Sequence, residues 1–175
     1  MPLAMFCGVK IILELAEYPK DEMLPSVFQT KFLELKDRFY SNFLHVYTDG
    51  SKKDMVTAAA MVCPGIENLC KTYRLPDGCS IFTAEAYAIR QVLVTIYIFK
   101  DTTPENIVVF SDSLSCLEAI KHYQIKNPFI CEILNLLHQL SSEFNKNIHL
   151  CWIPSHVDIK GNEAADLAAK SGLNL

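Results

Sequence analysis

The sequence has no excess of basic residues. It contains 16 Lys and Arg against 20 Asp and Glu, which gives a formal net charge of −4 and a pI near 5.7. Proteins that bind nucleic acids through bulk charge carry a high pI or a dense basic patch. The composition therefore excludes a strongly basic binding protein, and a nucleic-acid partner would have to be recognised by a more local feature.

Paired cysteines are also missing. The seven cysteines are an odd number, they form no CxxC pair, and several lie inside apolar runs. Structural zinc sites need clustered Cys or His ligands, and small secreted domains use even-numbered disulfide frameworks. We therefore predict a reduced, intracellular protein, cytoplasmic or nuclear, whose cysteines serve as small hydrophobic residues.

No segment has the features of a signal peptide or a membrane span. The first 15 residues, MPLAMFCGVKIILEL, lack a basic region, and Lys10 and Glu14 interrupt their apolar residues. A spanning helix needs about 20 mostly apolar residues, and no uncharged stretch of that length occurs elsewhere. With half of its residues hydrophobic and 21% charged, the 175-residue chain has the composition of one globular domain with no membrane contact.

The chain divides near residue 41. In residues 1–41, GVKIILEL is compatible with a short strand, and SVFQTKFLELKDRFY has the apolar spacing of an amphipathic helix that begins near Pro25. From residue 42 onward the turns and apolar runs follow one another closely. We therefore predict a lead-in or linker at 1–41 and one domain at 42–175.

Three short strands precede an alternation of helices and strands in this domain. The strands are expected at 43–49, 55–62 and 68–74, and the turn-forming sequences around them are Asp49-Gly50-Ser51, Pro64-Gly65 and Pro76-Asp77-Gly78. The later expected elements are a buried helix at 83–100, a strand at 106–112, two helices, a strand at 147–154 and a last helix closed by Gly172. The predicted fold class is α/β, with a five-stranded mixed sheet flanked by helices.

Carboxylates stand at the ends of several predicted elements. Asp49 and Asp112 end two strands, Glu85 lies near the start of the buried helix, and Asp166 is one turn into the last helix. Each has an ordinary explanation, because Asp-Gly is a turn pair and acidic residues suit helix N-termini. However, the carboxyl ends of neighbouring parallel strands open onto one crevice, which Glu85 and Asp166 could also reach.

Four carboxylates gathered in one crevice would indicate a divalent metal site. Their ionised forms repel one another, and hard oxygen ligands suit Mg²⁺ or Mn²⁺. Two such ions about 4 Å apart bind the attacking and leaving oxygens of a phosphodiester cleavage. The pattern therefore favours metal-dependent phosphoryl transfer.

Four motifs resemble those of ribonuclease H type 1 domains. YTDGS, FTAEAYAI, FSDSLSCL and WIPSHVDIKGNEAADLAA occur in the order and approximate spacing of that family, including the ten-residue spacing from His156 to Asp166. The resemblance covers about residues 42–172. The chain looks most like the domains of non-LTR (LINE-type) retrotransposon polyproteins.

The resemblance implies a fold, a reaction and a metal site. The fold would be ribonuclease H-like, with three antiparallel strands continued by two parallel ones. Asp49, Glu85, Asp112 and Asp166 would hold two Mg²⁺ ions, and His156 on a mobile loop would shuttle protons or ease product release. A metal-activated water would hydrolyse the RNA strand of an RNA–DNA hybrid, leaving a 5′-phosphate and a 3′-hydroxyl.

The resemblance also implies contacts with partners. The residues expected to contact the hybrid backbone or the water of the metal site are Gly50, Ser51, Thr83, Ser113 and Asn162. Each also has an ordinary explanation as a turn, cap or surface polar group. A reverse transcriptase region of a larger polyprotein is the implied protein partner.

Two departures from the family keep other functions open. Asp158 stands where many relatives have glycine, and Lys160 where retrotransposon relatives often have proline. The alternative is a catalytically weak or inactive retrotransposon-derived domain that binds hybrid or packs against a reverse transcriptase. A DNA-directed nuclease or strand transferase on the same fold is a third possibility, against which the His156 loop and Asp166 argue.

Overall fold

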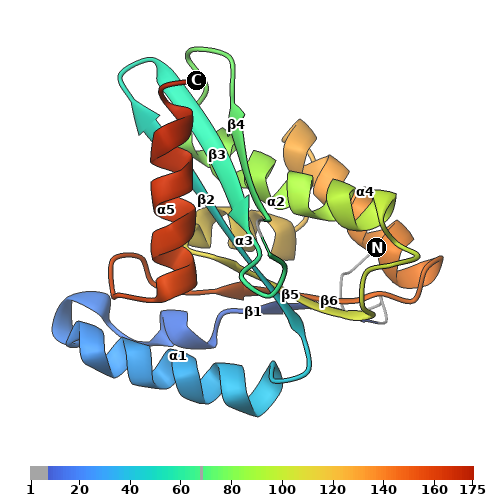
Figure 1. Cartoon of the computed structure of the whole chain (residues 1–175), viewed down its shortest axis with the longest axis horizontal. Helices are drawn as coiled ribbons and strands as arrows, with labels where there is room; N and C mark the ends of the chain where they lie inside the picture. Colours follow the sequence, from blue (N-terminus) through green and yellow to red (C-terminus); the bar gives the residue numbers. More distant parts are fainter. Residues whose placement is uncertain (1–7, 68) are drawn as a thin grey trace.

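A six-stranded mixed sheet forms the centre of the protein (Figure 1). The computed structural model describes residues 8–67 and 69–175. The strands are β1 (Val9–Ile12), β2 (Leu44–Lys53), β3 (Val56–Val62), β4 (Cys70–Arg74), β5 (Asn106–Ser111) and β6 (Asn147–Trp152). Their order is β1-β6-β5-β2-β3-β4, with β2, β3 and β4 antiparallel and with β1, β6 and β5 parallel to β2.

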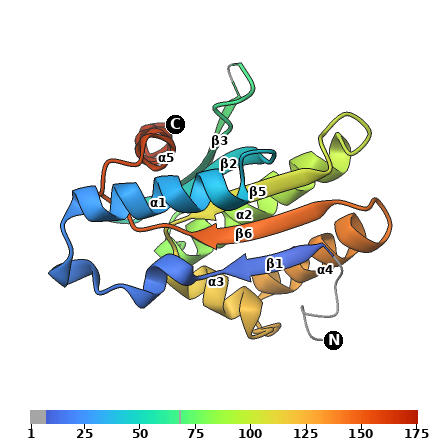
Figure 2. The same cartoon turned by 90° about the horizontal axis from the view of Figure 1, so that it is seen from below.

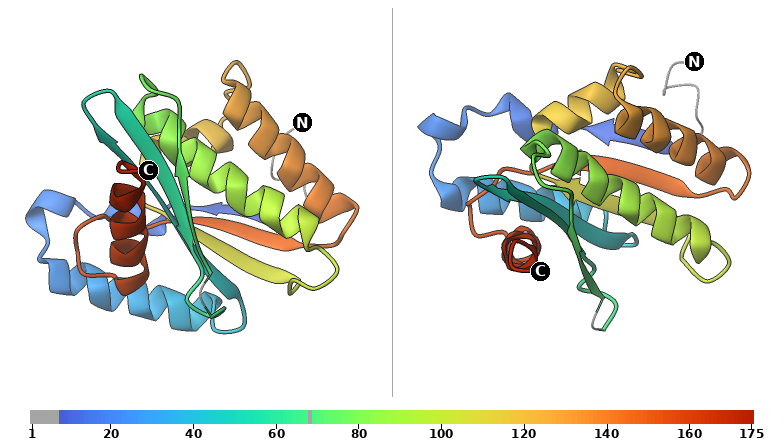
Figure 3. Two further views of the ribbon diagram at one scale, coloured as in Figure 1. Left: turned by 45° about the horizontal axis from the view of Figure 1, so that its top comes forward. Right: turned by 90° about the horizontal axis from the view of Figure 1, so that it is seen from above.

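Helices cover both faces of this sheet. Within the described residues they are α1 (Pro25–Phe39), α2 (Ile81–Ile98), α3 (Leu114–Lys121), α4 (Pro128–Ser142) and α5 (Lys160–Gly172), together with the short 3₁₀ helices η2 (Glu14–Glu17) and η3 (Lys20–Glu22). Figures 2 and 3 show α2, α3 and α4 on one face and α1 and α5 on the other. The mixed sheet between helical layers is the architecture that the sequence predicts.

The prediction of five strands is wrong, because β1 of the lead-in adds a sixth. β1 pairs in parallel with β6, from Val9 opposite Ile148 to Ile12 opposite Cys151. The apolar pattern of GVKIILEL is compatible with a strand, but a local pattern does not identify a partner far along the chain. Residues 8–40 thus contribute a strand to the same sheet. The division of the chain into a lead-in at 1–41 and a domain at 42–175 stays a prediction.

The interpretation of Asp49-Gly50-Ser51 as a turn is also wrong. β2 continues through these residues to Lys53, with Gly50 opposite Ala59 of β3. The chain reverses after Lys53, where Asp54 takes a φ of 56°. Glycine at position 50 serves packing instead, since a Cβ there would lie 2.9 Å from the Cβ of Ala84 in α2. A glycine at this position lets α2 approach the strand.

Consecutive alanines of β3 allow helices to pack closely on both faces of the sheet. Ala59 packs with Ala84 of α2, whereas Ala60 packs with Ala168 and Ala169 of α5. Successive side chains of a strand point to opposite faces, so neighbouring alanines serve different helices. The two helices are therefore held at short distance from the strands that carry the carboxylates.

The described cysteines form no disulfide. Cys63, Cys116 and Cys151 are buried, and the six cysteines for which the structure gives a side chain are all free. Cys7 lies outside the described residues. The three buried cysteines fill space in the core as small hydrophobic residues, which fits the prediction from their apolar surroundings.

One helix of the described chain, α2, is long and apolar enough to cross a membrane by length and composition alone. It contacts β2, β3 and α4, and it carries Glu85 into the interior of the fold. These are the surroundings of a core helix.

The lead-in helix α1 packs on the sheet through aromatic side chains. Phe32 meets Phe110 of β5 edge-on, with 5.3 Å between the ring centroids. Tyr40, which directly follows α1, also packs edge-on against Phe110, and its hydroxyl lies 3.1 Å from Nδ1 of His149 in β6. Burial lowers the pKa of His149 from 6.5 to about 4, so this ring is neutral in the folded protein at neutral pH.

His149 should make the folded state sensitive to acid. Between pH 6.5 and about 4 the unfolded chain binds a proton that the folded chain does not, so stability falls as the pH is lowered through this window. On going from pH 7 to pH 4.5, we expect wild type to lose about 2 kcal/mol more than His149→Gln. Urea unfolding at the two pH values measures both losses, and equal losses would contradict the prediction.

Candidate active site

Three carboxylates from different parts of the chain meet at one place on the sheet. Asp49 of β2, Glu85 of α2 and Asp112, which follows β5, each offer an oxygen within 4.8 Å of the others. Asp49 comes directly after Thr48, whose pairing with Ser111 is the last between β2 and β5. The parallel pairing of β2 with β5 therefore brings Asp49 and Asp112 together, as the sequence predicts for neighbouring strand ends.

Asp112 does not cap helix α3, so the explanation of this carboxylate as an acidic residue at a helix N-terminus is wrong. Ser113 caps α3, with its Oγ accepting a hydrogen bond from the backbone N–H of Cys116 at 3.4 Å. The Asp112 carboxylate instead accepts a hydrogen bond from the Asn162 amide of α5 at 3.1 Å. The indole N–H of Trp152 donates to the Asp112 backbone carbonyl at 3.2 Å. These contacts hold the carboxylate away from the helix start.

Glu85 is buried without a full set of hydrogen bonds. Glu85 is 6% exposed, and among the described residues its Oε2 has no hydrogen-bond partner. The start of α2 is capped by Ser80, whose Oγ accepts from the N–H of Thr83 at 3.1 Å, so Glu85 is not needed there. A buried carboxylate oxygen without a partner is costly, and a cation would satisfy it. The donor set therefore fits a divalent metal with oxygen ligands.

Burial and mutual repulsion raise the pKa of each clustered carboxyl group. Burial first, and then the charge of Asp112, raise the pKa of Asp49 to about 8. Burial and the charges of Asp112 and Asp49 raise the pKa of Glu85. Burial also raises the pKa of Asp112, against the hydrogen bond from Asn162 and the nearby charge of His156. A divalent cation would reverse these shifts by stabilising the ionised forms.

The metal-free protein should gain stability when Glu85 is neutralised. A carboxyl group with a raised pKa costs stability once the pH exceeds its unfolded value, so the cost is present at pH 7.5. We expect Glu85→Gln to raise the free energy of unfolding by about 1–2 kcal/mol in EDTA, measured with urea.

The matched control for this measurement is Glu34→Gln on the exposed face of α1, which should change stability by less than about 0.5 kcal/mol. A Glu85→Gln protein less stable than wild type would show that the ionised carboxylate is already well accommodated.

Asp166 lies beside the three carboxylates but is not one of the group. Its Oδ2 is 2.8 Å from Nζ of Lys170, one turn further along α5. Its charge nevertheless contributes to the raised pKa of both Asp49 and Asp112, so it faces the same site. The structure thus brings three of the four predicted carboxylates into contact and places the fourth at the edge of the site.

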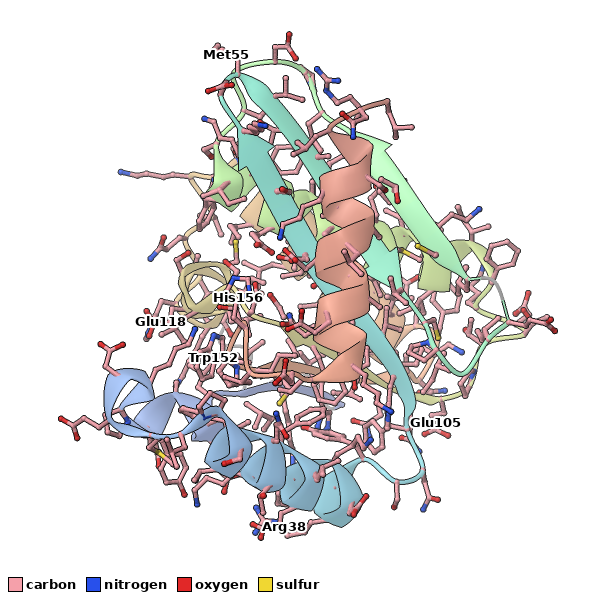
Figure 4. All side chains as sticks on the ribbon, turned by 60° about the vertical axis from the view of Figure 1, so that its left-hand side comes forward. Arg38, Met55, Glu105, Glu118, Trp152 and His156 are labelled. Atoms are coloured by element: carbon pink, nitrogen blue, oxygen red, sulfur yellow. The ribbon has the colours of Figure 1, made fainter. Side chains whose placement is uncertain are left out.

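His156 lies on the loop between β6 and α5. It is exposed, and it takes a φ of 57°. In Figure 4 it projects from this loop above α1, on the same side as Trp152. Its charge lowers the pKa of Asp112, so the imidazole lies within electrostatic range of the carboxylates.

Two of the five residues predicted to contact nucleic acid bond to the carboxylates, and the other three lie within two residues of one along the chain. The Gly50 N–H donates to Oδ1 of Asp49 at 2.9 Å, and Asn162 is 3% exposed with its amide committed to Asp112. Thr83 and Ser113 stand at the starts of α2 and α3, and Ser51 is half-buried on β2. Gly50 and Asn162 therefore orient carboxylates, and contact of the five residues with nucleic acid stays a prediction.

Two residues that contact the site were missed by sequence reasoning. Lys170 pairs with Asp166, and its position four residues later on the same helix is a signal that could have identified it. Trp152 supports the Asp112 backbone from the end of β6, and no local pattern indicates this contact.

Comparison with known proteins identifies the family. A protein-family model described as RNase H matches residues 41–174. A search of curated proteins found no matching relative. The match spans every element from β2 to α5, and with it the three clustered carboxylates, Asp166 and His156. The six-stranded mixed sheet has the expected ribonuclease H-like fold with one strand added. The chain therefore belongs to the RNase H family.

Proposed function

We propose that the protein hydrolyses the RNA strand of RNA–DNA hybrids in a metal-dependent reaction that leaves 5′-phosphate and 3′-hydroxyl ends. The observation that carries the proposal is the buried Glu85 carboxylate beside Asp49 and Asp112, whose Oε2 has no hydrogen-bond partner among the described residues. Membership of the RNase H family supports the choice of substrate.

Asp49, Glu85 and Asp112 would hold divalent metal, with Asp166 as a further ligand of a two-ion site. Mg²⁺ is the proposed metal and Mn²⁺ the alternative, since both favour carboxylate oxygens. Such ions act as Lewis acids and lower the pKa of bound water.

The chain's own residues would prepare this site for catalysis. Asn162 holds the Asp112 carboxylate in place through its amide. His156, exposed and close to Asp112, would accept or deliver a proton at its imidazole during the reaction.

Recognition of RNA would depend on the 2′-hydroxyl groups. These lie in the wide, shallow minor groove of the hybrid, where polar backbone and side-chain groups can reach them. Gly50, Ser51, Thr83, Ser113 and Asn162 are the proposed contact residues around the carboxylates. The low content of basic residues would make binding by the isolated chain weak and sensitive to salt.

A second candidate is a hybrid-binding domain with little or no catalysis. The observation that favours it is the Asp166–Lys170 ion pair, because an ammonium group already neutralises one proposed ligand. The resemblance of the motifs to retrotransposon domains supports an origin of that kind. It also supports a reverse transcriptase region as partner. The apolar surroundings of the cysteines support an intracellular location, cytoplasmic or nuclear.

Hydrolysis of end-labelled substrates separates the two candidates. With Mg²⁺ or Mn²⁺, we expect cleavage of the RNA strand of a hybrid and no cleavage of single-stranded RNA, double-stranded RNA or double-stranded DNA. EDTA should abolish the reaction. Hybrid binding without cleavage in either metal would support the second candidate, and cleavage of DNA duplexes would contradict both.

A further inference from the structure

Residues 8–40 lie before the matched RNase H region, yet this segment contacts the loop that carries His156. Lys20 of η3 donates through Nζ to the Ser155 hydroxyl at 3.0 Å. Gln29 of α1 donates through Nε2 to Oδ2 of Asp158 at 3.5 Å. The two contacts therefore lie on either side of His156.

The loop has a backbone that needs support. His156 and Asp158 take φ values of 57° and 59°, a left-handed conformation that few residues other than glycine adopt, although Asp and His do so more often than most. Between them, Val157 is 4% exposed, and Ile159 after them is 5% exposed. The buried side chains anchor the loop, while the exposed His156 depends on the two strained positions for its direction.

The lead-in provides a fixed frame for these contacts. Phe28, Phe32 and Leu35 of α1 are buried in the core, so Gln29 is presented from a helix that cannot easily move. A cavity of about 420 Å³ lies between α1 and the start of α5, lined in part by Phe32, Asp158 and Lys160. Gln29 and Asp158 both line this space, so their hydrogen bond links α1 to the loop beside it.

We propose that Lys20 and Gln29 are positioning residues that hold the His156 loop in its left-handed conformation, so that the imidazole faces the carboxylate cluster. The inference rests on the proposed function, since it gives the lead-in a role in catalysis. Lys20 and Gln29 lie outside residues 41–174, which match the family model, yet they would assist the reaction carried out by that region.

The test uses the full chain with the double variant Lys20→Ala/Gln29→Ala. We expect kcat for hybrid cleavage to fall about fivefold, with KM within twofold of wild type. Tm should change by less than about 2 °C, because both side chains are on the surface. Amide hydrogen exchange at residues 155–158 should become faster in metal-free protein, which gives a readout independent of activity.

Two control variants separate the loss of the hydrogen bonds to the loop from the loss of the Lys20 charge. Lys31→Ala removes an equal charge from the same lead-in without touching the loop, and it should leave kcat and loop exchange unchanged. Lys20→Gln, which keeps a donor without the charge, should recover part of the loss caused by Lys20→Ala.

A double-mutant cycle with His156→Ala tests the pathway directly. If Lys20 and Gln29 act through His156, the double variant should have no further effect on kcat in the His156→Ala protein. If the wild type cleaves hybrid and the double variant has the same kcat and the same loop exchange, this inference is overturned while the proposed function stands. A wild type that does not cleave would contradict the proposed function, while loop exchange would still report whether the contacts hold the loop.

Discussion

Asp112→Asn is expected to lower kcat for hybrid cleavage by at least about 10³-fold. Asn has the shape of Asp but no charge, so the change removes a proposed metal ligand while disturbing the packing little. The hydrogen bond from Asn162 shows that the Asp112 carboxylate already has a fixed orientation, which the substitution largely keeps. The measurement is the multiple-turnover rate on a labelled hybrid at saturating substrate and Mg²⁺.

The fold of the variant should survive, which makes the loss of rate interpretable. Because burial and neighbouring charges raise the pKa of Asp112, we expect Asp112→Asn to be at least as stable as wild type in EDTA. Asp101→Asn, an exposed carboxylate after α2, is the matched control and should retain full activity. Equal rates for wild type and Asp112→Asn would refute catalysis at this centre.

The carboxylate cluster could be predicted because its signals are local. A carboxylate within or directly after an apolar strand breaks the pattern expected for a buried segment, which singles out Asp49 and Asp112. Their meeting then follows from the geometry of parallel strands. The burial of Glu85 could not be predicted in this way, since an acidic residue near a helix start is ordinary on any exposed helix.

Features that depend on distant pairing could not be predicted. The strand β1 joins the sheet only because β6 offers it a free edge, and no local pattern of β1 contains that information. The role of Gly50 cannot be predicted for a related reason. Absence of a Cβ suits both a turn and a close helix approach, and only the position of Ala84 in space decides between them.

Gly161→Ala is expected to lower the free energy of unfolding by about 3 kcal/mol. Gly161 lies in the first turn of α5, and a Cβ at this position would overlap the ring of Tyr47. That ring cannot easily move away, because Tyr47 is 5% exposed and stacks on Phe110 with 5.0 Å between centroids. Urea unfolding of wild type and variant measures the loss.

A control glycine and a Tyr47 variant test whether overlap with the Tyr47 ring causes the loss of stability in Gly161→Ala. Gly65→Ala should be nearly neutral, since a Cβ there would meet only the Leu44 side chain at 3.7 Å and neither glycine has a positive φ. In a Tyr47→Leu background the cost of Gly161→Ala should shrink by at least half. An undiminished cost there would exclude the Tyr47 ring as its source. Because Asn162 follows Gly161 and holds Asp112, displacement of α5 in Gly161→Ala should also lower kcat, which links helix packing to the carboxylate site.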